Sequence, residues 1–563
     1  MATRALPGLL AALLLLTTGA APSAAATPAQ HWPTPATRSE ASSQAGSAKL
    51  RKPHLPIHRI AFQRLKHAKP RLLTSPARIA SAVSTGLNAA GLSYVDNGLF
   101  QTVPPDTTGA IGPNHYVEMV NSIIGVYNRS DLSLVGKTDF NIWLGAGTPL
   151  TGPPLCDPQI QWDPSSQRWL YVVLECNFGL DKFLYGWSKT PDPSNLVSGW
   201  CKFSVNTPGV LSDYPKLGHN SKYMLVGTNN YSDAAGNAFV TAQITWMRTP
   251  DAGVSTCSAP VVSSVGTAAS PLLNGDGLSQ ASTPVPVNTS TNASDGYVVA
   301  AYDPFGPPAA PQNKLAVFHV DGSGVFHADS DITVNTYSTP PPRAYNFGGN
   351  SAGLDTLDGR LTQAAGDPIT GIYTQHTVDG GGVRSKVTWY EIQVVSSVPT
   401  LTQEGDIASS TDFVFNAAIS PRADGQGAVI FYNRVGALTH PIIAAQTRMI
   451  WTPAGQMDPG EIVLGASTAG DSDFSCNYTG QNDPCRWGDY SGASPDPVNK
   501  NVVWGSNQAL TTQPGGLANT NWVTQNFSIV GPCVRCSASQ SSPRPTSGRD
   551  PALPGPTATP GTR

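Results

Sequence analysis

Two short hydrophobic runs separated by a polar turn form the clearest pattern in this chain. The segment CDPQIQWDPSSQRWLYVVLEC, from Cys156 to Cys176, places Trp, Tyr, Val and Leu on both sides of turn residues 163–167. Such runs around a turn rich in Pro and Ser predict a β-hairpin. Cys156 and Cys176 are equally spaced about Ser166, so we expect them to face each other across the hairpin.

A polar start, a turn and a hydrophobic strand recur seven times between residues 96 and 536. The copies start at Asp106, Asp157, Asp213, Ser282, Arg360, Asn416 and Asp489. Further strand candidates such as NAFVTAQITWM and SKVTWYEIQVV follow them. Roughly 60 residues per copy suits a four-stranded sheet, and such sheets arranged around one axis form a propeller. We therefore predict an all-β, seven-bladed β-propeller of four-stranded antiparallel blades; a double sandwich is the alternative.

The composition supports short strands rather than helical bundles. The chain contains 55 Gly and 50 Pro, and only 13% of its residues are charged. Frequent turn residues with few helix signals favour an all-β fold.

Both ends of the chain differ from the repeated body. Residues 1–26 combine an early Arg, an apolar run and small residues, which is typical of a secretory signal peptide. Residues 27–95 form a basic, irregular pro-segment or linker, and residues 537–563 form a disordered tail rich in Pro, Ser and Thr. No other stretch is long and apolar enough to span a membrane, so we expect a secreted, extracellular protein.

Charge also separates the ends from the body. Residues 1–95 carry 11 Lys or Arg and one acid, whereas the whole chain has a net charge of −3. Residues 96–536 are therefore acidic. An acidic body argues against a nucleic-acid partner, because binding phosphates requires a basic surface.

Three of the copies resemble a known group of proteins. The segments PDTTGAIGPNHYVEMVN, CDPQIQWDPSSQRWLYV and WGDYSGASPDP are similar to those of secreted bacterial seven-bladed β-propeller proteins, which are sialidase-like in shape. The resemblance covers residues 96–536 and implies the fold. It does not imply sialidase activity, because no Ser-x-Asp-x-Gly-x-Thr-Trp box is intact; VDGGGVRSKVTW (378–389) is a degenerate form.

Eight cysteines in an exported chain are expected to form disulfides. Proximity along the chain favours the pairs Cys156–Cys176, Cys201–Cys257, Cys476–Cys485 and Cys533–Cys536. Other pairings remain open for eight cysteines. The last pair, CVRC, lacks the strand-to-helix context of a redox dithiol and the second pair of a zinc ribbon, so we expect a structural link.

The starts of the seven copies are the candidate site, because equivalent positions of a propeller converge on the mouth of one channel. We expect Asp106, Asp157, Asp213, Asp489 and Arg360 to be catalytic. Two carboxyl groups in different environments could cleave a glycosidic bond, and the Arg could bind an acidic sugar. Alternatively, the carboxylates cap their own turns.

Four further residues are candidates for substrate binding. They are Asn416, Tyr214, Tyr490 and Trp487. Aromatic rings could stack on sugars, although Trp and Tyr also fill the space between blades. As a cofactor, only Ca²⁺ is considered, bound either by the ring of carboxylates or by the alternating oxygens of residues 471–477.

These observations predict a secreted, monomeric propeller that binds an extracellular polysaccharide or glycoconjugate at its channel mouth. If it is an enzyme, it is a glycoside hydrolase or a polysaccharide lyase. The alternative function is a non-catalytic adhesion or scaffold module. Paired internal carboxylates would favour the scaffold, and an acid of raised pKa would favour the enzyme.

Overall fold

The computed structural model describes residues 84–97, 102–147, 152–176, 181–232, 238–302 and 311–532, except for residues 369, 382, 396–397, 477–482 and 513–519. The expected signal peptide, most of the basic segment and the C-terminal tail lie outside these residues. Within them, nearly all regular structure is β-strand, apart from the short helix α1 (Phe140–Leu144) and the 3-10 turn η1 (Tyr94–Asn97). The predicted all-β class is confirmed.

The strands form antiparallel groups of chain neighbours. The first three groups are β2 (Thr108–Ile111), β3 (His115–Val120), β4 (Ile123–Asn128) and β5 (Leu134–Asp139); β6 (Leu155–Asp163), β7 (Arg168–Glu175), β8 (Lys182–Ser188) and β9 (Trp200–Asn206); and β10 (Val210–His219), β11 (Tyr223–Ser232), β12 (Ala238–Arg248) and β13 (Val262–Val265).

The later groups repeat this order. They are β14 (Val285–Thr289), β15 (Gly296–Ala301), β16 (Gln312–Val320), β17 (Phe326–Ala328) and β18 (Ile332–Tyr337); β19 (Leu361–Asp367), β20 (Gly371–Asp379), β21 (Ser385–Val395) and β22 (Val398–Ile407); β23 (Phe413–Pro421), β24 (Gly427–Val435), β25 (Ile442–Met449) and β26 (Ile462–Ala466); and β27 (Gly492–Pro495), β28 (Val502–Thr512), β29 (Thr520–Val530) and β1 (Ser84–Ser93).

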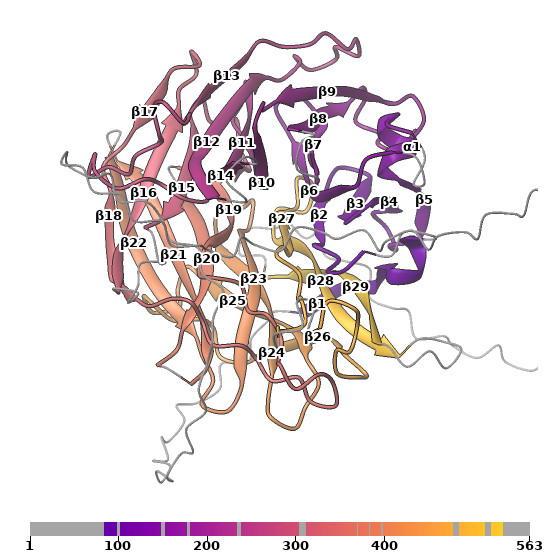
Figure 1. Ribbon diagram of the computed structural model, residues 1–563, viewed down its shortest axis with the longest axis vertical. Coiled ribbons are helices and arrows are strands. Elements are labelled where there is room, and N and C mark those ends of the chain that lie inside the picture. The colour runs from indigo at the N-terminus through magenta and orange to yellow at the C-terminus, as the bar shows by residue number, and fades with distance from the viewer. Residues whose placement is uncertain are drawn as a thin grey trace, which may run out of the picture.

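The first strands of the groups form a closed ring. β2 contacts β6, then β10, β14, β19, β23 and β27 follow in contact with one another, and β27 contacts β2. Figure 1 shows several of these strands near the middle of the molecule, with β5, β9 and β18 at its edge. This is a propeller of four-stranded antiparallel sheets. Short parallel pairings join β10, β14 and β19 into one 13-stranded sheet, so the number of seven blades stays a prediction.

The hydrophobic core is divided among the spaces between neighbouring groups. Val117 of β3 and Tyr171 of β7 belong to one cluster, and Phe431 of β24 packs against Phe527 of β29 with ring centroids 4.7 Å apart. Every residue of β7 is buried. Because both faces of a sheet bury apolar side chains, each sheet needs a neighbour on either side.

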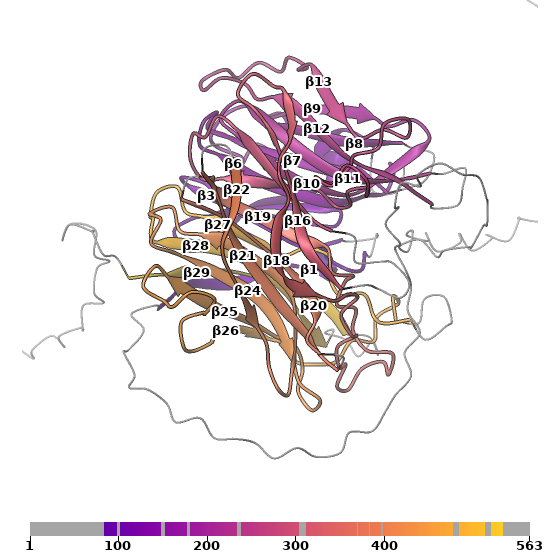
Figure 2. The ribbon, with the colours of Figure 1, turned by 90° about the vertical axis from the view of Figure 1, so that its left-hand side faces the viewer.

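A strand from the start of the described chain completes the last group. β1 pairs with β29, and Ser84 lies opposite Val530. In Figure 1 the indigo start of the chain therefore meets the yellow end, and Figure 2 shows the molecule from the side. The described part of the propeller includes β1, which starts at Ser84 and so precedes the predicted boundary at residue 96, because β1 pairs with β29.

Three predicted disulfides are confirmed. Cys156–Cys176, Cys201–Cys257 and Cys476–Cys485 are bonded. The first links β6 to the end of β7, as the symmetric hairpin predicted. The expected pair Cys533–Cys536 lies outside the described residues. No helix in the described part of the chain has the length and apolar character to cross a membrane.

Candidate functional site

Several of the repeated openings share an unusual backbone conformation. The left-handed residues are Asp106 (φ 47°), Asp157 (φ 54°), Tyr214 (φ 55°), Thr283 (φ 48°) and Asn416 (φ 48°). Residues with a side chain rarely adopt this region, and Thr is among the least tolerant. In β6, β10 and β23 the strand register also shifts at this point. A repeated β-bulge therefore turns the chain as it enters the inner strands.

The sequence predicted these openings closely. The left-handed residue coincides with the predicted start of the copy at Asp106, Asp157 and Asn416. It lies one residue later, at Tyr214 and Thr283, in the two copies aligned on Asp213 and Ser282. The repeat therefore located the bulges to within one residue in these five copies.

The structure brings the four predicted carboxylates together. The backbone N–H of Asp489 donates to Asp106 Oδ1 at 2.6 Å, and the Tyr490 hydroxyl donates to Asp157 Oδ2 at 3.0 Å. Asp213 is close enough to Asp157 for their charges to repel. These acids come from four different groups of strands, and together we call them the mouth cluster.

The four acids of the mouth cluster differ in burial. Asp106 and Asp157 are buried, with exposed fractions of 3% and 8%. Asp213 and Asp489 are half-buried. A ligand approaching from solvent would therefore meet Asp213 and Asp489 first.

Burial and neighbouring negative charges raise the pKa values of Asp106, Asp157 and Asp213. Burial, followed by the Asp489 and Asp157 charges, raises the pKa of Asp106 well above its usual range. Burial and the Asp213 charge raise the pKa of Asp157 to about 7. Burial also raises the pKa of Asp213 to about 6, although the Arg360 charge acts in the opposite direction. Near neutral pH the cluster can therefore hold both protonated and ionised carboxyl groups.

Two arginines balance part of this charge. Arg486 donates to Asp489 Oδ2 at 2.7 Å and lies 3.5 Å from Asp355 Oδ2. The predicted Arg360 is buried and donates from Nε to Asp358 Oδ1 at 2.7 Å. Arg360 is thus paired with an acid of its own loop, and its charge also acts on Asp213.

Lys216 lies within the cluster, and the sequence did not single it out. Its Nζ is 4.0 Å from the centre of the Tyr214 ring and 3.7 Å from that of Tyr490. It is 2% exposed and donates no hydrogen bond to a protein atom. Burial lowers the pKa of Lys216 well below its usual range, although Asp157 and Asp489 oppose this shift.

Asn121 is a second residue that the sequence did not predict. Its amide donates to Asp106 Oδ2 at 2.6 Å, and its Oδ1 accepts from the backbone N–H of Asp157 at 2.8 Å. It therefore holds two neighbouring openings at a fixed spacing. Asn121 follows β3, outside the repeated start, so only its place in the fold reveals this role. The sequence could have pointed to Lys216, because this residue lies three positions after Asp213, the predicted start of the third copy.

The four predicted substrate-binding residues are buried. Tyr214 and Tyr490 stack with ring centroids 4.9 Å apart and are 2% and 1% exposed, so their faces contact each other and Lys216. Trp487 is 1% exposed and lies in a hydrophobic cluster. The side chain of Asn416 donates to Asn433 and Asn507, away from the carboxylates.

A small cavity lies among the first strands of the groups, next to Lys216. It has a volume of about 20 Å³ and is lined by residues of β2, β6, β10, β14, β19 and β27, including Gln161, Lys216 and Gln363. This is room for one water molecule rather than for a sugar.

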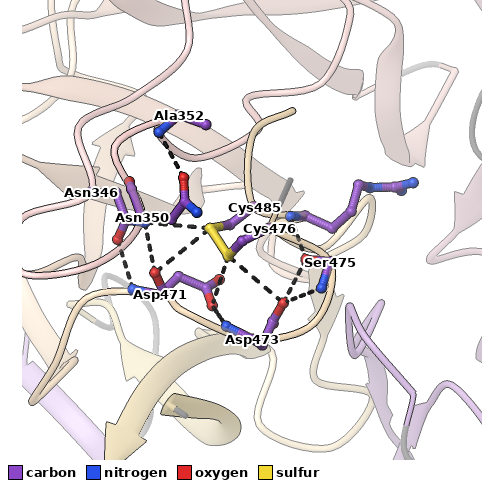
Figure 3. Close-up of a disulfide and its surroundings, with 9 residues drawn as sticks. Asn346, Asn350, Ala352, Asp471, Asp473, Ser475, Cys476 and Cys485 are labelled. Atoms are coloured by element: carbon purple, nitrogen blue, oxygen red, sulfur yellow. Dashed lines mark hydrogen bonds between the residues drawn. A yellow bond between two sulfur atoms is a disulfide. The ribbon is translucent and has the colours of Figure 1, made fainter. Parts of the chain in front are cut away.

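The calcium expectation finds little geometric support. Among the described residues, the only group of three or more His, Cys, Asp or Glu able to share a metal ion is Asp471, Cys476 and Cys485. Figure 3 shows that the two sulfurs are bonded to each other. Asp473 Oδ1 instead accepts from its own turn, at the N–H and hydroxyl of Ser475. The predicted ligand Asn477 lies outside the described residues.

The chain is similar to solved structures of other proteins. No protein-family model and no curated protein matches it. Drosophila semaphorin 1b (extracellular domains 1-2) shares 9% identity, with a TM-score of 0.36, and the match covers 78% of this chain and 86% of that one. An exo-beta-1,3-galactanase from Phanerochaete chrysosporium shares 11%, with a TM-score of 0.28 and coverages of 79% and 100%. At such TM-scores these likenesses carry no argument about function.

Proposed function

We propose that this protein is secreted and that its mouth cluster binds an extracellular glycan and hydrolyses a glycosidic bond. One observation carries the proposal. Asp213 and Asp489 lie half-buried at the same mouth, and their surroundings differ. Glycoside hydrolysis needs two carboxyl groups of this kind, one protonated and one ionised.

The two acids differ in the charged groups beside them. The pKa of Asp213 is raised to about 6, so a sizeable fraction of it holds a proton in mildly acidic solution. This group would donate the proton to the leaving oxygen. Asp489 forms an ion pair with Arg486 at 2.7 Å, which stabilises its negative charge. It would act as the base or nucleophile.

The two more buried acids, Asp106 and Asp157, support this division of roles between Asp213 and Asp489. Asp106 and Asp157 have raised pKa values, which reduces the negative charge facing Asp489. Asn121 holds the carboxyl group of Asp106 and the backbone of Asp157 in place. Export is supported by three disulfides, which persist in oxidising environments. We propose that the protein acts as a monomer.

The test is a screen of the purified protein against neutral and acidic polysaccharides, with reducing ends measured from pH 4 to 8. We expect Asp213→Asn and Asp489→Asn each to lower kcat by about 10²-fold or more, as for other acid–base groups. Asp251→Asn, whose side chain is 78% exposed, is the matched control. Because Asp213 must be protonated, the wild-type rate should fall as pH rises above about 6.

A scaffold function is the second candidate, and one observation favours it. Both carboxylate oxygens of Asp106 accept hydrogen bonds from within the protein, at Asn121 and Asp489. Glycan binding without product in the same screen would select this function. Product that persists in both Asn variants would place the chemistry elsewhere.

A further inference from the structure

Exposed aromatic side chains are unevenly distributed over this molecule. Among the residues that the structure describes, the Phe, Tyr and Trp side chains that are most exposed are Tyr345 (40%), Phe347 (42%), Phe474 (45%) and Trp451 (56%). Three of the four lie on two segments, 343–355 and 471–486, which pair with each other beside the mouth cluster. Single apolar residues at a surface are ordinary, but a group of them beside a candidate site indicates a binding surface.

Tyr345 and Phe347 pack against the same end of one sheet. The Tyr345 ring centroid lies 4.9 Å from that of Phe413, at the start of β23, and the Phe347 ring centroid lies 5.4 Å from that of His440, in the loop after β24. Phe413 pairs with Val435, the last residue of β24, so both rings lie where β24 leaves the sheet. We call Tyr345 and Phe347 the aromatic rim.

Hydrogen bonds fix the backbone that carries the aromatic rim. Asn346, between the two rings in the chain, donates from Nδ2 to Asp471 O at 2.8 Å and accepts at Oδ1 from the Asp471 N–H at 2.7 Å (Figure 3). Gly470 lets the two segments approach, because a Cβ at that position would lie 2.3 Å from Phe347 O. The rim is therefore held in place before any ligand binds, which lowers the entropic cost of binding.

Direct contacts also connect the aromatic rim to the acids of the mouth cluster. The residue before Tyr345 exchanges two backbone hydrogen bonds with Leu354, at 2.9 and 3.0 Å. The next residue, Asp355, has its Oδ2 3.5 Å from Arg486 Nε, and Arg486 donates to Asp489 at 2.7 Å. A short run of contacts thus joins the rim to Asp489.

We propose that the aromatic rim binds sugar rings of the glycan on which the mouth cluster acts, an inference that rests on the proposed function of that cluster. The substrate is then a chain of several sugars rather than a single terminal sugar, because the acids act on one bond and the rim contacts a unit beyond it. The C–H groups on the faces of a sugar ring are apolar and pack against aromatic side chains. Contacts remote from the reacting bond add affinity that a small glycoside cannot use.

Trp451 offers a matched comparison on the same sheet. It is 56% exposed and follows β25, which ends at Met449 opposite Gly427. Gly427 begins β24, whereas the rim packs where β24 ends, so Trp451 lies at the opposite end of the sheet. If any exposed aromatic ring sufficed, Trp451 would contribute to glycan binding as much as the rim.

The experiment is affinity electrophoresis of the full chain through native gels that contain xylan, arabinan, galactan, β-1,3-glucan or hyaluronan. We expect at least one polysaccharide to slow the wild type, and Tyr345→Ala and Phe347→Ala each to weaken that binding about 10-fold. Trp451→Ala should bind as the wild type does, and free monosaccharides should not compete. Tyr345→Trp and Phe347→Tyr keep a ring and should retain binding, which separates a lost contact from a misfolded chain.

Three outcomes would overturn the proposal. They are equal retardation of the wild type and both Ala variants, no retardation of the wild type by any of these polysaccharides, and competition by a monosaccharide as strong as that by the polymer. Asp489→Asn separates this proposal from the proposed function. If it binds without forming product while both Ala variants bind as the wild type does, hydrolysis stands and the rim fails. Binding that needs the rim, without product in the wild type, keeps the rim and rejects hydrolysis.

Discussion

At the scale of single residues, environment rather than residue type separates the acids of this protein. Asp157 is buried among other carboxyl groups, and its pKa rises to about 7. Asp321 lies at the surface, and the N–H of Val325 together with His327 lowers its pKa to about 2. The sequence alone does not distinguish these two aspartates. Only the first can hold a proton near neutral pH, so only that kind of acid suits proton transfer.

The raised pKa of Asp157 predicts a pH-dependent stability. The folded pKa of about 7 exceeds the ordinary value of 3.8, so the folded protein binds this proton more tightly than the unfolded chain. The free energy of unfolding therefore falls as pH rises from about 4 to 7, by on the order of 3 kcal/mol for this group. Asp157→Asn should remove that loss and gain stability relative to the wild type at pH 8.

Urea unfolding of both proteins at pH 4.5 and 8 measures the effect. Asp251→Asn is again the control, since its side chain is 78% exposed. An equal pH dependence in the wild type and Asp157→Asn would show that Asp157 titrates normally.

At the scale of elements, the bulges and the disulfides position the mouth cluster. The Cys156–Cys176 bond joins β6 to the residue that follows β7. Cys156 immediately precedes Asp157 in the chain, so this bond fixes the backbone beside Asp157. Cys201–Cys257 ties β9 to the segment between β12 and β13, and it spans 56 residues. Cys476–Cys485 spans only 9 residues. Links of different span restrict the unfolded chain to different degrees.

Removing the long link should therefore cost more stability than removing the short one. In the chain-entropy model, replacing Cys201 and Cys257 by Ala costs about 4 kcal/mol, and replacing Cys476 and Cys485 costs about 2.7 kcal/mol. Guanidinium unfolding of the two double variants checks the order. The reverse order would mean that packing around Cys485, which is fully buried, outweighs the chain entropy.

At the scale of the whole molecule, closure of the ring joins the two ends of the described chain. β1 covers the edge of β29, and Leu92 is 1% exposed. The N–H of Leu92 donates to Glu118 Oε2 at 3.1 Å, and Thr524 donates to the carbonyl oxygen of Leu92 at 2.9 Å. Glu118 is fully buried, so it depends on hydrogen bonds such as the one from the Leu92 N–H.

Truncation tests the closure. A chain lacking residues 1–95 should unfold at lower denaturant concentration and aggregate, because β29 becomes an open edge and Glu118 loses a donor. A chain lacking residues 1–80 keeps β1 and should match the full protein. Equal unfolding midpoints and equal solubility of the two truncated chains would rule out a stabilising role for β1.

Much of the fold follows from local signals. Turn residues, alternating strands and the repeated opening predicted a propeller, because these preferences act within a few residues. The same openings pointed to Asp106, Asp157, Asp213 and Asp489, which do lie together. Nearness in sequence was sufficient for three disulfides, since each closes within a group of strands or beside one.

Other features depend on contacts between distant parts of the chain. The sequence did not reveal that β1 belongs to the last sheet, because its partner β29 lies more than 400 residues away. Nor did it reveal that Lys216, Arg486 and Asn121 lie at the mouth cluster. It left open whether Tyr214 and Trp487 bind sugar or fill the core, and the structure buries both. Local preferences shape each strand and turn, but ring closure determines which side chains meet and how much water reaches them.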